Sequence, residues 1–104
     1  MISTRDENPN HRIICVEGRF DYQLRGDFRE AYANVQPSMR TIDVDLRRAS
    51  YLDSAGLGML LLLHEFMVGR EGEARIISPA PAVKELLDVA RFDRYFQICA
   101  EPEE

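Results

Sequence analysis

The sequence has few of the residues from which metal and catalytic sites are built. It contains no tryptophan, two cysteines and two histidines. Neither His11 nor His64 has a cysteine or a carboxylate nearby at zinc-ligand spacing, which argues against a metal site. Cys15 and Cys99 each lie in a stretch typical of a strand, and because a free cysteine behaves as a small hydrophobic residue, we expect both to be buried thiols.

Long apolar runs and an excess of positive charge are also missing. The longest apolar stretch ends at His64 and Glu65, well short of the roughly 20 residues that span a bilayer. The first ten residues are polar and lack the apolar centre of a secretory signal. Lysine and arginine number 13 against 18 acidic residues, and the net charge of −5 disfavours nucleic acid and anionic membranes as the main partner. These features predict a cytoplasmic protein without direct membrane insertion.

Motifs for catalysis and for cofactor binding are absent as well. A nucleophilic Ser54 would need a base, and His64 lies nearly three turns further along the same predicted helix. The sequence has no glycine-rich phosphate loop with a lysine, which makes a nucleotide sensor a weak hypothesis. We therefore expect no enzymatic activity and no cofactor.

The length of 104 residues suits one domain with its own hydrophobic core. Apolar periodicity predicts strands and helices in alternation, which is typical of an α/β fold with a largely parallel or mixed sheet. The predicted strands are 11–20, broken at Gly18, then 40–46, 74–77 and 96–99, and the predicted helices are 22–35, 54–68 and 83–90. Around a domain at 11–100, we expect a flexible segment at 1–10 and a loose acidic tail at 101–104.

The junction between the strand at 40–46 and the following helix carries the strongest functional signal. Residues 51–58 form a small polar turn that leads directly into the apolar run 59–63. Such loops collect at the carboxyl ends of strands, where ligands and partners dock in open α/β sheets. Ser54 is the expected N-cap, because its hydroxyl can accept a hydrogen bond from a first-turn amide, and Asp53 suits the positive end of the helix dipole.

The helix that starts at this junction has unusual glycines and an unusual apolar surface. Gly56 is expected to allow close approach to a neighbouring backbone and Gly58 to keep the first turn slim, since glycine in a helix costs about 1 kcal/mol relative to alanine. The helix is apolar on every side, so it is either buried throughout or leaves Met59 or Leu62 exposed for a partner. We favour core packing, although an exposed Met59 would suit docking because methionine adapts to irregular surfaces.

Three segments of the sequence resemble those of a known family. The run Asp53-Ser54-Ala55-Gly56-Leu57-Gly58, with Gly18-Arg19-Phe20-Asp21 upstream and an Ile76-Ile77-Ser78-Pro79 loop downstream, resembles a STAS domain of the anti-sigma factor antagonist type. The resemblance covers residues 11–100 and implies a small, mixed, mostly parallel sheet with helices packed mainly on one side. It also implies a protein without catalytic chemistry of its own.

The resemblance further implies a partner and a switch. Family members bind an anti-sigma factor that is also a serine kinase of the histidine-kinase-like ATPase type, and so release a sigma factor in a partner-switching pathway that controls transcription. A phosphatase or a response regulator are further partners of such pathways, and the chain itself is expected to be a monomer or a weak dimer. The residues expected to face the partner are Asp21, Asp53, Ser54, Ala55, Gly56, Leu57 and Met59.

Position 55 departs from the family pattern Asp-Ser-Ser/Thr-Gly, in which the hydroxyl residue before the glycine accepts a phosphate. Ala55 cannot be phosphorylated, so the chain is a natural variant locked in its binding-competent form, is regulated by other means, or carries an alanine in place of an original serine. Ser54, one residue away, is the alternative acceptor.

Ala55 also fits a different class of function. STAS domains with an Asp-Ser/Thr-Ala-Gly motif resemble permanent subunits of transport machinery, such as the small cytoplasmic component of a bacterial ABC-type lipid transport complex. No phosphorylation switch is needed in such a subunit. The genes beside this one would separate the two hypotheses, because they would encode either a sigma factor and its regulators or transporter subunits.

Overall fold

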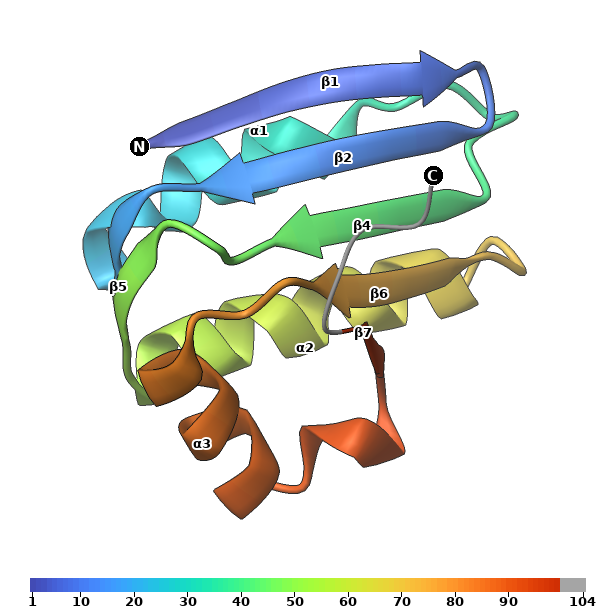
Figure 1. Cartoon of the computed structure of the whole chain (residues 1–104). Coiled ribbons are helices and arrows are strands. Elements are labelled where there is room, and N and C mark those ends of the chain that lie inside the picture. Colours follow the sequence, from blue (N-terminus) through green and yellow to red (C-terminus); the bar gives the residue numbers. More distant parts are fainter. Residues whose placement is uncertain (100–104) are drawn as a thin grey trace.

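A computed structural model describes residues 1–99, and a five-stranded sheet dominates it (Figure 1). The strands are β1 (Ile2–Asn8), β2 (His11–Val16), β3 (Gly18–Phe20), β4 (Thr41–Asp45), β5 (Ala49–Leu52), β6 (Glu73–Ile77) and β7 (Gln97–Cys99). The helices are α1 (Arg25–Ala33), α2 (Ser54–Val68) and α3 (Pro81–Val89), with short 3-10 helices η1 (Tyr22–Leu24) and η2 (Phe92–Arg94). The predicted acidic tail at 101–104 lies outside the described residues.

The main sheet has the order β1-β2-β4-β6-β7, and β3 and β5 form a separate parallel pair. Strand β1 runs antiparallel to β2, while β2, β4, β6 and β7 are mutually parallel. Helices α1 and α2 lie on one face of this sheet, and α3 packs near β5 (Figure 1). The prediction of a mixed, mostly parallel sheet with helices mainly on one side is confirmed.

The core lies between the main sheet and α1 and α2. Successive side chains of a strand point to opposite faces, so every second residue of β4, such as Ile42 and Val44, is fully buried under the helices. From the helical side, α2 contributes Leu60, Leu63 and Met67, none of which is exposed. The predicted helix at 54–68 is therefore confirmed, with its inner face in the core.

The N-terminal segment 1–10 was predicted to be flexible, but it contains β1. The prediction failed because Ile2 is the only apolar residue in β1, so the strand has no pattern of apolar residues. Strand β1 is held in the sheet by its pairing with β2. Arg12 of β2 secures the pair: its Nε and Nη2 atoms lie 2.6 and 3.2 Å from the Asp6 carboxylate, and its Nη1 atom donates to the Ala31 carbonyl of α1. The hydrogen bond from Arg12 lowers the pKa of Asp6.

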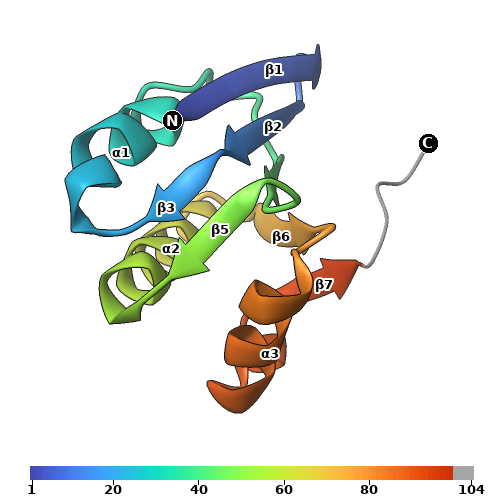
Figure 2. The ribbon, with the colours of Figure 1, turned by 60° about the vertical axis from the view of Figure 1, so that its left-hand side comes forward.

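Strand β5 is a second element that sequence reasoning missed, because it has only four residues and its buried and exposed side chains do not alternate. Instead of passing by one loop into α2, the chain turns after β4 and pairs β5 with β3 (Figure 2). The predicted break at Gly18 is confirmed, since this residue adopts a φ of 85°, which non-glycine residues rarely adopt. This change of backbone direction separates β3 from β2, so that β3 pairs with β5 in the second sheet.

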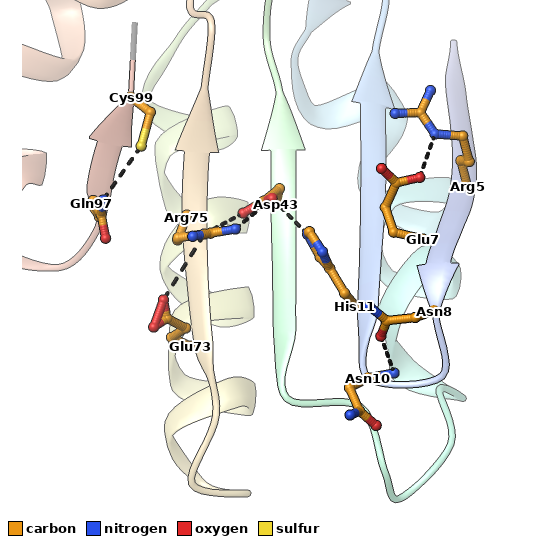
Figure 3. Close-up of polar contacts among 10 residues, drawn as sticks. All are labelled: Arg5, Glu7, Asn8, Asn10, His11, Asp43, Glu73, Arg75, Gln97 and Cys99. Carbon is orange, nitrogen blue, oxygen red and sulfur yellow. Dashed lines mark hydrogen bonds and ion pairs between the residues drawn. The ribbon is translucent and has the colours of Figure 1, made fainter. Parts of the chain in front are cut away.

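The face of the main sheet opposite α1 and α2 carries a network of charged side chains (Figure 3). Among residues 1–99, no helix lies over this face of the sheet (Figure 1). Asp43 in β4 is 3% exposed. Arg75 from β6 binds both carboxylate oxygens at 2.7 and 2.9 Å, and His11 from β2 lies 2.7 Å from one of them. The long side chains of Arg75 and His11 thus lie across the sheet and cover the carboxylate.

Both cysteines lie on this same uncovered face. They are free thiols, as predicted, but each is half-buried and not fully buried. The strand registers Cys15↔Asp45, Asp45↔Ile77 and Ile77↔Cys99 place them in one row across four strands. They are therefore far apart, with two strands between them, and cannot form a disulfide with each other.

Replacing Asp43 tests the charged network. Asp43→Ala removes the buried carboxylate that joins Arg75 and His11 across three strands, and we expect a loss of about 3 kcal/mol in the free energy of unfolding, measured by urea denaturation. Asp88→Ala is the matched control, because Asp88 forms an exposed pair with Lys84 four residues away, and should cost about 0.5 kcal/mol or less. Equal effects of the two substitutions would contradict a structural role of the network.

Candidate functional site

The candidate site is built where β3 and β5 end side by side. Phe20 and Leu52 are partners in the parallel register of these strands, and each is followed by an aspartate, Asp21 and Asp53. Because parallel neighbours end at the same edge, two residues that are 32 positions apart in the sequence emerge next to each other. The pairing of β3 with β5 thus brings the two predicted acidic site residues together.

Both aspartates cap helices. Asp21 accepts a hydrogen bond from the Gln23 amide at 3.0 Å and caps η1, and Asp53 accepts one from the Gly56 amide at 3.0 Å and caps α2. The prediction that Ser54 is the N-cap is therefore wrong. The extended backbone of Asp53, with φ of −126° and ψ of −171°, points its carboxylate at the free amides, whereas Ser54 is already the first helical residue.

The first turn of α2 presents its residues with increasing burial. Ser54 is exposed, Ala55 is half-buried and Gly56 is buried. Since Asp53 takes the capping role, the Ser54 hydroxyl is not required for it. The side chains of Ser54 and Ala55 thus meet solvent directly after Asp53, at the start of this turn.

Gly56 is where α2 comes closest to β3. A Cβ atom added here would lie 2.6 Å from the carbonyl oxygen of Phe20 and would overlap the side chain of Leu52. The predicted close approach is confirmed. Gly58 was expected to keep the first turn slim, but a Cβ atom there would meet no atom within 4 Å, so no packing contact requires glycine at this position.

Two apolar residues of the predicted partner surface have other roles. The side chain of Met59 is 8% exposed and belongs to the core, so the hypothesis of an exposed docking methionine is wrong. Leu57 is partly buried and packs against the core from outside. The large apolar residues that α2 does expose are Leu62, at 54%, and its last residue Val68, at 55%. Periodicity could not choose between these faces, because the helix is apolar all round.

Sequence reasoning missed two residues whose side chains each contact one of the aspartates and also stack on each other. Arg19 and Tyr51 are direct partners in the β3–β5 register, and the guanidinium carbon of Arg19 lies 3.8 Å from the centroid of the Tyr51 ring. Arg19 Nε donates to Asp21 at 3.3 Å, and the Tyr51 hydroxyl lies 3.5 Å from Asp53. For Arg19 the available signal is its place directly before the apolar Phe20 in β3, whereas β5, which is buried only at its two ends, gives no such signal for Tyr51.

A second stack of the same kind lies beside Asp21. The guanidinium carbon of Arg25 is 3.9 Å from the centroid of the Tyr22 ring, which is 62% exposed. Arginine and tyrosine are the residue types most enriched at the centres of protein interfaces. We call the set Arg19, Asp21, Tyr22, Tyr51, Asp53, Ser54 and Ala55 the partner surface.

The histidine considered as a catalytic base is not part of the partner surface. His64, the base considered for Ser54, lies elsewhere, with its ring 5.6 Å from that of Tyr95 and 5.7 Å from that of Phe96. Within residues 1–99, no three histidine, cysteine or acidic side chains are grouped so as to hold a metal ion. None of the helices in the same range has the length and apolar character needed to cross a membrane.

The amino-acid sequence is similar to those of known proteins. A family model described as "Mlab, STAS domain" matches residues 3–99. A STAS-domain containing protein from Pseudomonas aeruginosa (strain UCBPP-PA14) is 41% identical over 85 residues, which cover 82% of this chain and 84% of that protein. The putative anti-sigma factor antagonist BtrV from Bordetella bronchiseptica is 27% identical over 99 residues, or 94% of this chain and 85% of that protein.

The fold is also found in solved structures. The anti-sigma factor antagonist SpoIIAA, in its unphosphorylated form, superimposes with a TM-score of 0.75 at 17% sequence identity, covering 99% of this chain and 90% of that chain. At this identity the likeness concerns the fold alone. It includes the first strand, which the sequence-based prediction had left outside the domain.

Gly56→Ala tests whether the approach of α2 to β3 is tight. The new methyl group would press on a backbone oxygen, which cannot move without shifting β3, and we expect a loss of about 1 to 3 kcal/mol in the free energy of unfolding. Urea denaturation followed by circular dichroism measures this change. Gly58→Ala is the control: it meets open space and should stabilise the protein by up to about 1 kcal/mol. A Gly56→Ala variant as stable as Gly58→Ala would contradict the close approach.

Proposed function

Because the chain belongs to the STAS domain family, in the form that anti-sigma factor antagonists share, we propose that it binds a serine-kinase-type anti-sigma factor through the partner surface. The observation that carries this proposal is the register of β3 with β5. It gathers both aspartates and the first turn of α2 into one exposed surface, with Ala55 at the position where the family pattern has its hydroxyl residue. Binding there would compete with the sigma factor for the kinase.

The shape and charge of this surface support a role in binding. Asp21 and Asp53 use one carboxylate oxygen each for helix capping and direct the other toward Arg19 and Tyr51. The Arg19–Tyr51 stack therefore has a defined geometry before a partner arrives, which reduces the entropy that binding must cost. Rigid aromatic and arginine side chains held in this way are typical anchors of interfaces.

Ala55 determines how such an interaction would be regulated. A phosphate at this position would add about 1.5 to 2 negative charges next to Asp53, and repulsion together with desolvation would weaken binding to the kinase. Alanine removes that possibility. We infer that the chain stays competent to bind whether or not the kinase has ATP.

Ser54 offers a second way to introduce the same charge. Its side chain is exposed, and the N-cap role that would have occupied its hydroxyl belongs to Asp53. A phosphate on Ser54 would lie at the positive end of α2, where anions are stabilised, so the modified helix would remain folded. Modification of Ser54 would therefore change binding without unfolding the site.

A second candidate function is supported by Ala55 and by the description of the matching family model, which names Mlab. In this alternative the chain is a permanent STAS subunit of an ABC-type lipid transport complex. The same surface would then contact the transporter ATPase without any switch. Affinity capture separates the two functions, because each names a different partner protein.

Substitutions at position 55 test the proposed function. With the chain as bait in a lysate of its host, we expect mass spectrometry to identify a histidine-kinase-like ATPase, retained with or without ATP. Ala55→Ser should retain the same ATPase and release it on addition of ATP. Recovery of transporter subunits by both baits, with no effect of ATP, would contradict the proposal and favour the lipid transport complex.

Ala55→Glu imitates the charge of a phosphate. We expect affinity for the purified ATPase to fall about tenfold or more, as measured by isothermal titration calorimetry. Ala55→Gln is the matched control, because it adds nearly the same bulk without the charge, and its affinity should lie closer to that of the parent chain. If Ala55→Glu bound as tightly as the parent chain, the partner would use a different surface.

Phosphorylation of Ser54 can be tested directly by intact mass. A phosphorylated chain isolated from its host would be heavier by one phosphate group, and Ser54→Ala would lose this species. Ser50 provides the control, because it is an exposed serine on β5 close to the site. Loss of the added mass in Ser50→Ala, or its absence in cells grown with and without stress, would contradict the role of Ser54.

A further inference from the structure

A pocket of about 300 Å³ opens on the uncovered face of the main sheet, at the carboxyl ends of β2 and β4. Ser3 of β1 and Cys15 of β2, which are partners in the antiparallel register, are among its lining residues. Their small side chains leave space above the sheet. None of the residues that line the pocket belongs to the partner surface, so the pocket is independent of the proposed function.

The pocket differs from the rest of this face. Near the middle of the strands, Arg75 and His11 extend across the sheet and cover Asp43 (Figure 3). One row further toward the carboxyl ends, the side chains in register are the shorter Ser3, Cys15 and Asp45. The hollow is therefore a consequence of which side chains the sequence places in this row.

Three guanidinium groups line the pocket, from Arg5, Arg47 and Arg48. Two carboxylates oppose them. Asp45 is occupied in the turn after β4, where it accepts a hydrogen bond from the Arg47 amide at 2.9 Å. Glu17 lies 3.9 Å from Arg48 in an exposed and therefore weak pair. Arg5 is paired as well, because its Nε atom lies 3.1 Å from the carboxylate of Glu7. The positive charge that an anion would meet in the pocket therefore comes from Arg47 and Arg48.

Arg47 is held in place by a neutral group. Its Nη2 atom donates to the hydroxyl of Ser78 at 3.3 Å, and Ser78 is itself 7% exposed. A neutral acceptor orients the guanidinium group without cancelling its charge. Arg47 is therefore prepared to bind an anion at small entropic cost.

We propose that this pocket binds a small phosphorylated sugar or polyol. Guanidinium groups match the geometry of phosphate oxygens, and the pocket lies at the carboxyl ends of parallel strands, where open α/β sheets bind ligands. The carboxylate of Glu17 can accept hydrogen bonds from hydroxyl groups, which suits a ligand with an alcohol part better than bare phosphate. The volume is that of a small-molecule site.

Amide NMR titration of the full chain tests this proposal. The probes are the phosphate monoester of ribose, inorganic phosphate, ribose and sodium chloride, all at matched ionic strength. We expect the monoester to cause saturable shifts at the amides of Ser3, Cys15 and Glu17. Inorganic phosphate should bind more weakly, and ribose and sodium chloride should cause no saturable shift.

The double variant Arg47→Gln/Arg48→Gln should weaken binding of the monoester about tenfold or more, since each guanidinium contact is charge-assisted. The control Arg91→Gln/Arg94→Gln removes the same charge from η2 and its N-cap and should leave the affinity unchanged. Dispersed amide spectra check that both variants are folded. The proposal is overturned by shifts that follow ionic strength alone, by equal effects of the two double variants, or by inorganic phosphate binding as tightly as the monoester.

Discussion

The approach of α2 to the backbone of β3 at Gly56 is the constraint on which the candidate site depends. The Gly56 amide donates a hydrogen bond to Asp53 at 3.0 Å. Only a residue without a side chain fits here, because a Cβ atom at position 56 would lie 2.6 Å from the carbonyl oxygen of Phe20. This contact holds the first turn of α2 against β3. As a result, a helix start and two strand ends that are distant in sequence present one continuous surface.

The two faces of the main sheet are covered by different groups, and this difference explains where polar side chains are buried. One face is covered by α1 and α2 and is apolar. The other is covered in part by its own long side chains, with Arg75 and His11 lying over Asp43. A charge can be buried on that face because its partners come from the neighbouring strands of the same sheet. Where the side chains are shorter, the same face leaves a pocket lined with arginines.

Much of the fold could be predicted because most elements carry their own periodicity. The strands at 41–45 and 73–77 place an apolar residue at every second position, on the face that lies under the helices, which the sequence pattern records. The helix at 54–68 was marked by its polar first turn and its long apolar run. Strands β1 and β5 could not be predicted in this way. β1 is polar and joins the sheet through its backbone and Arg12, and β5 has only four residues, two of them exposed.

The residues of the site could be predicted from the sequence, but their contacts, burial and capping roles could not. By itself, the sequence determined that Asp21, Asp53 and Ala55 belong to a recognisable motif and that Ala55 lacks a hydroxyl, because residue identity is a local property. The tertiary structure decided that Asp53 and not Ser54 caps α2, that Met59 is buried while Leu62 is exposed, and that Arg19 stacks on Tyr51. These outcomes depend on the pairing of β3 with β5 and on which side of an all-apolar helix meets the sheet, and both are set by contacts between residues far apart in the chain.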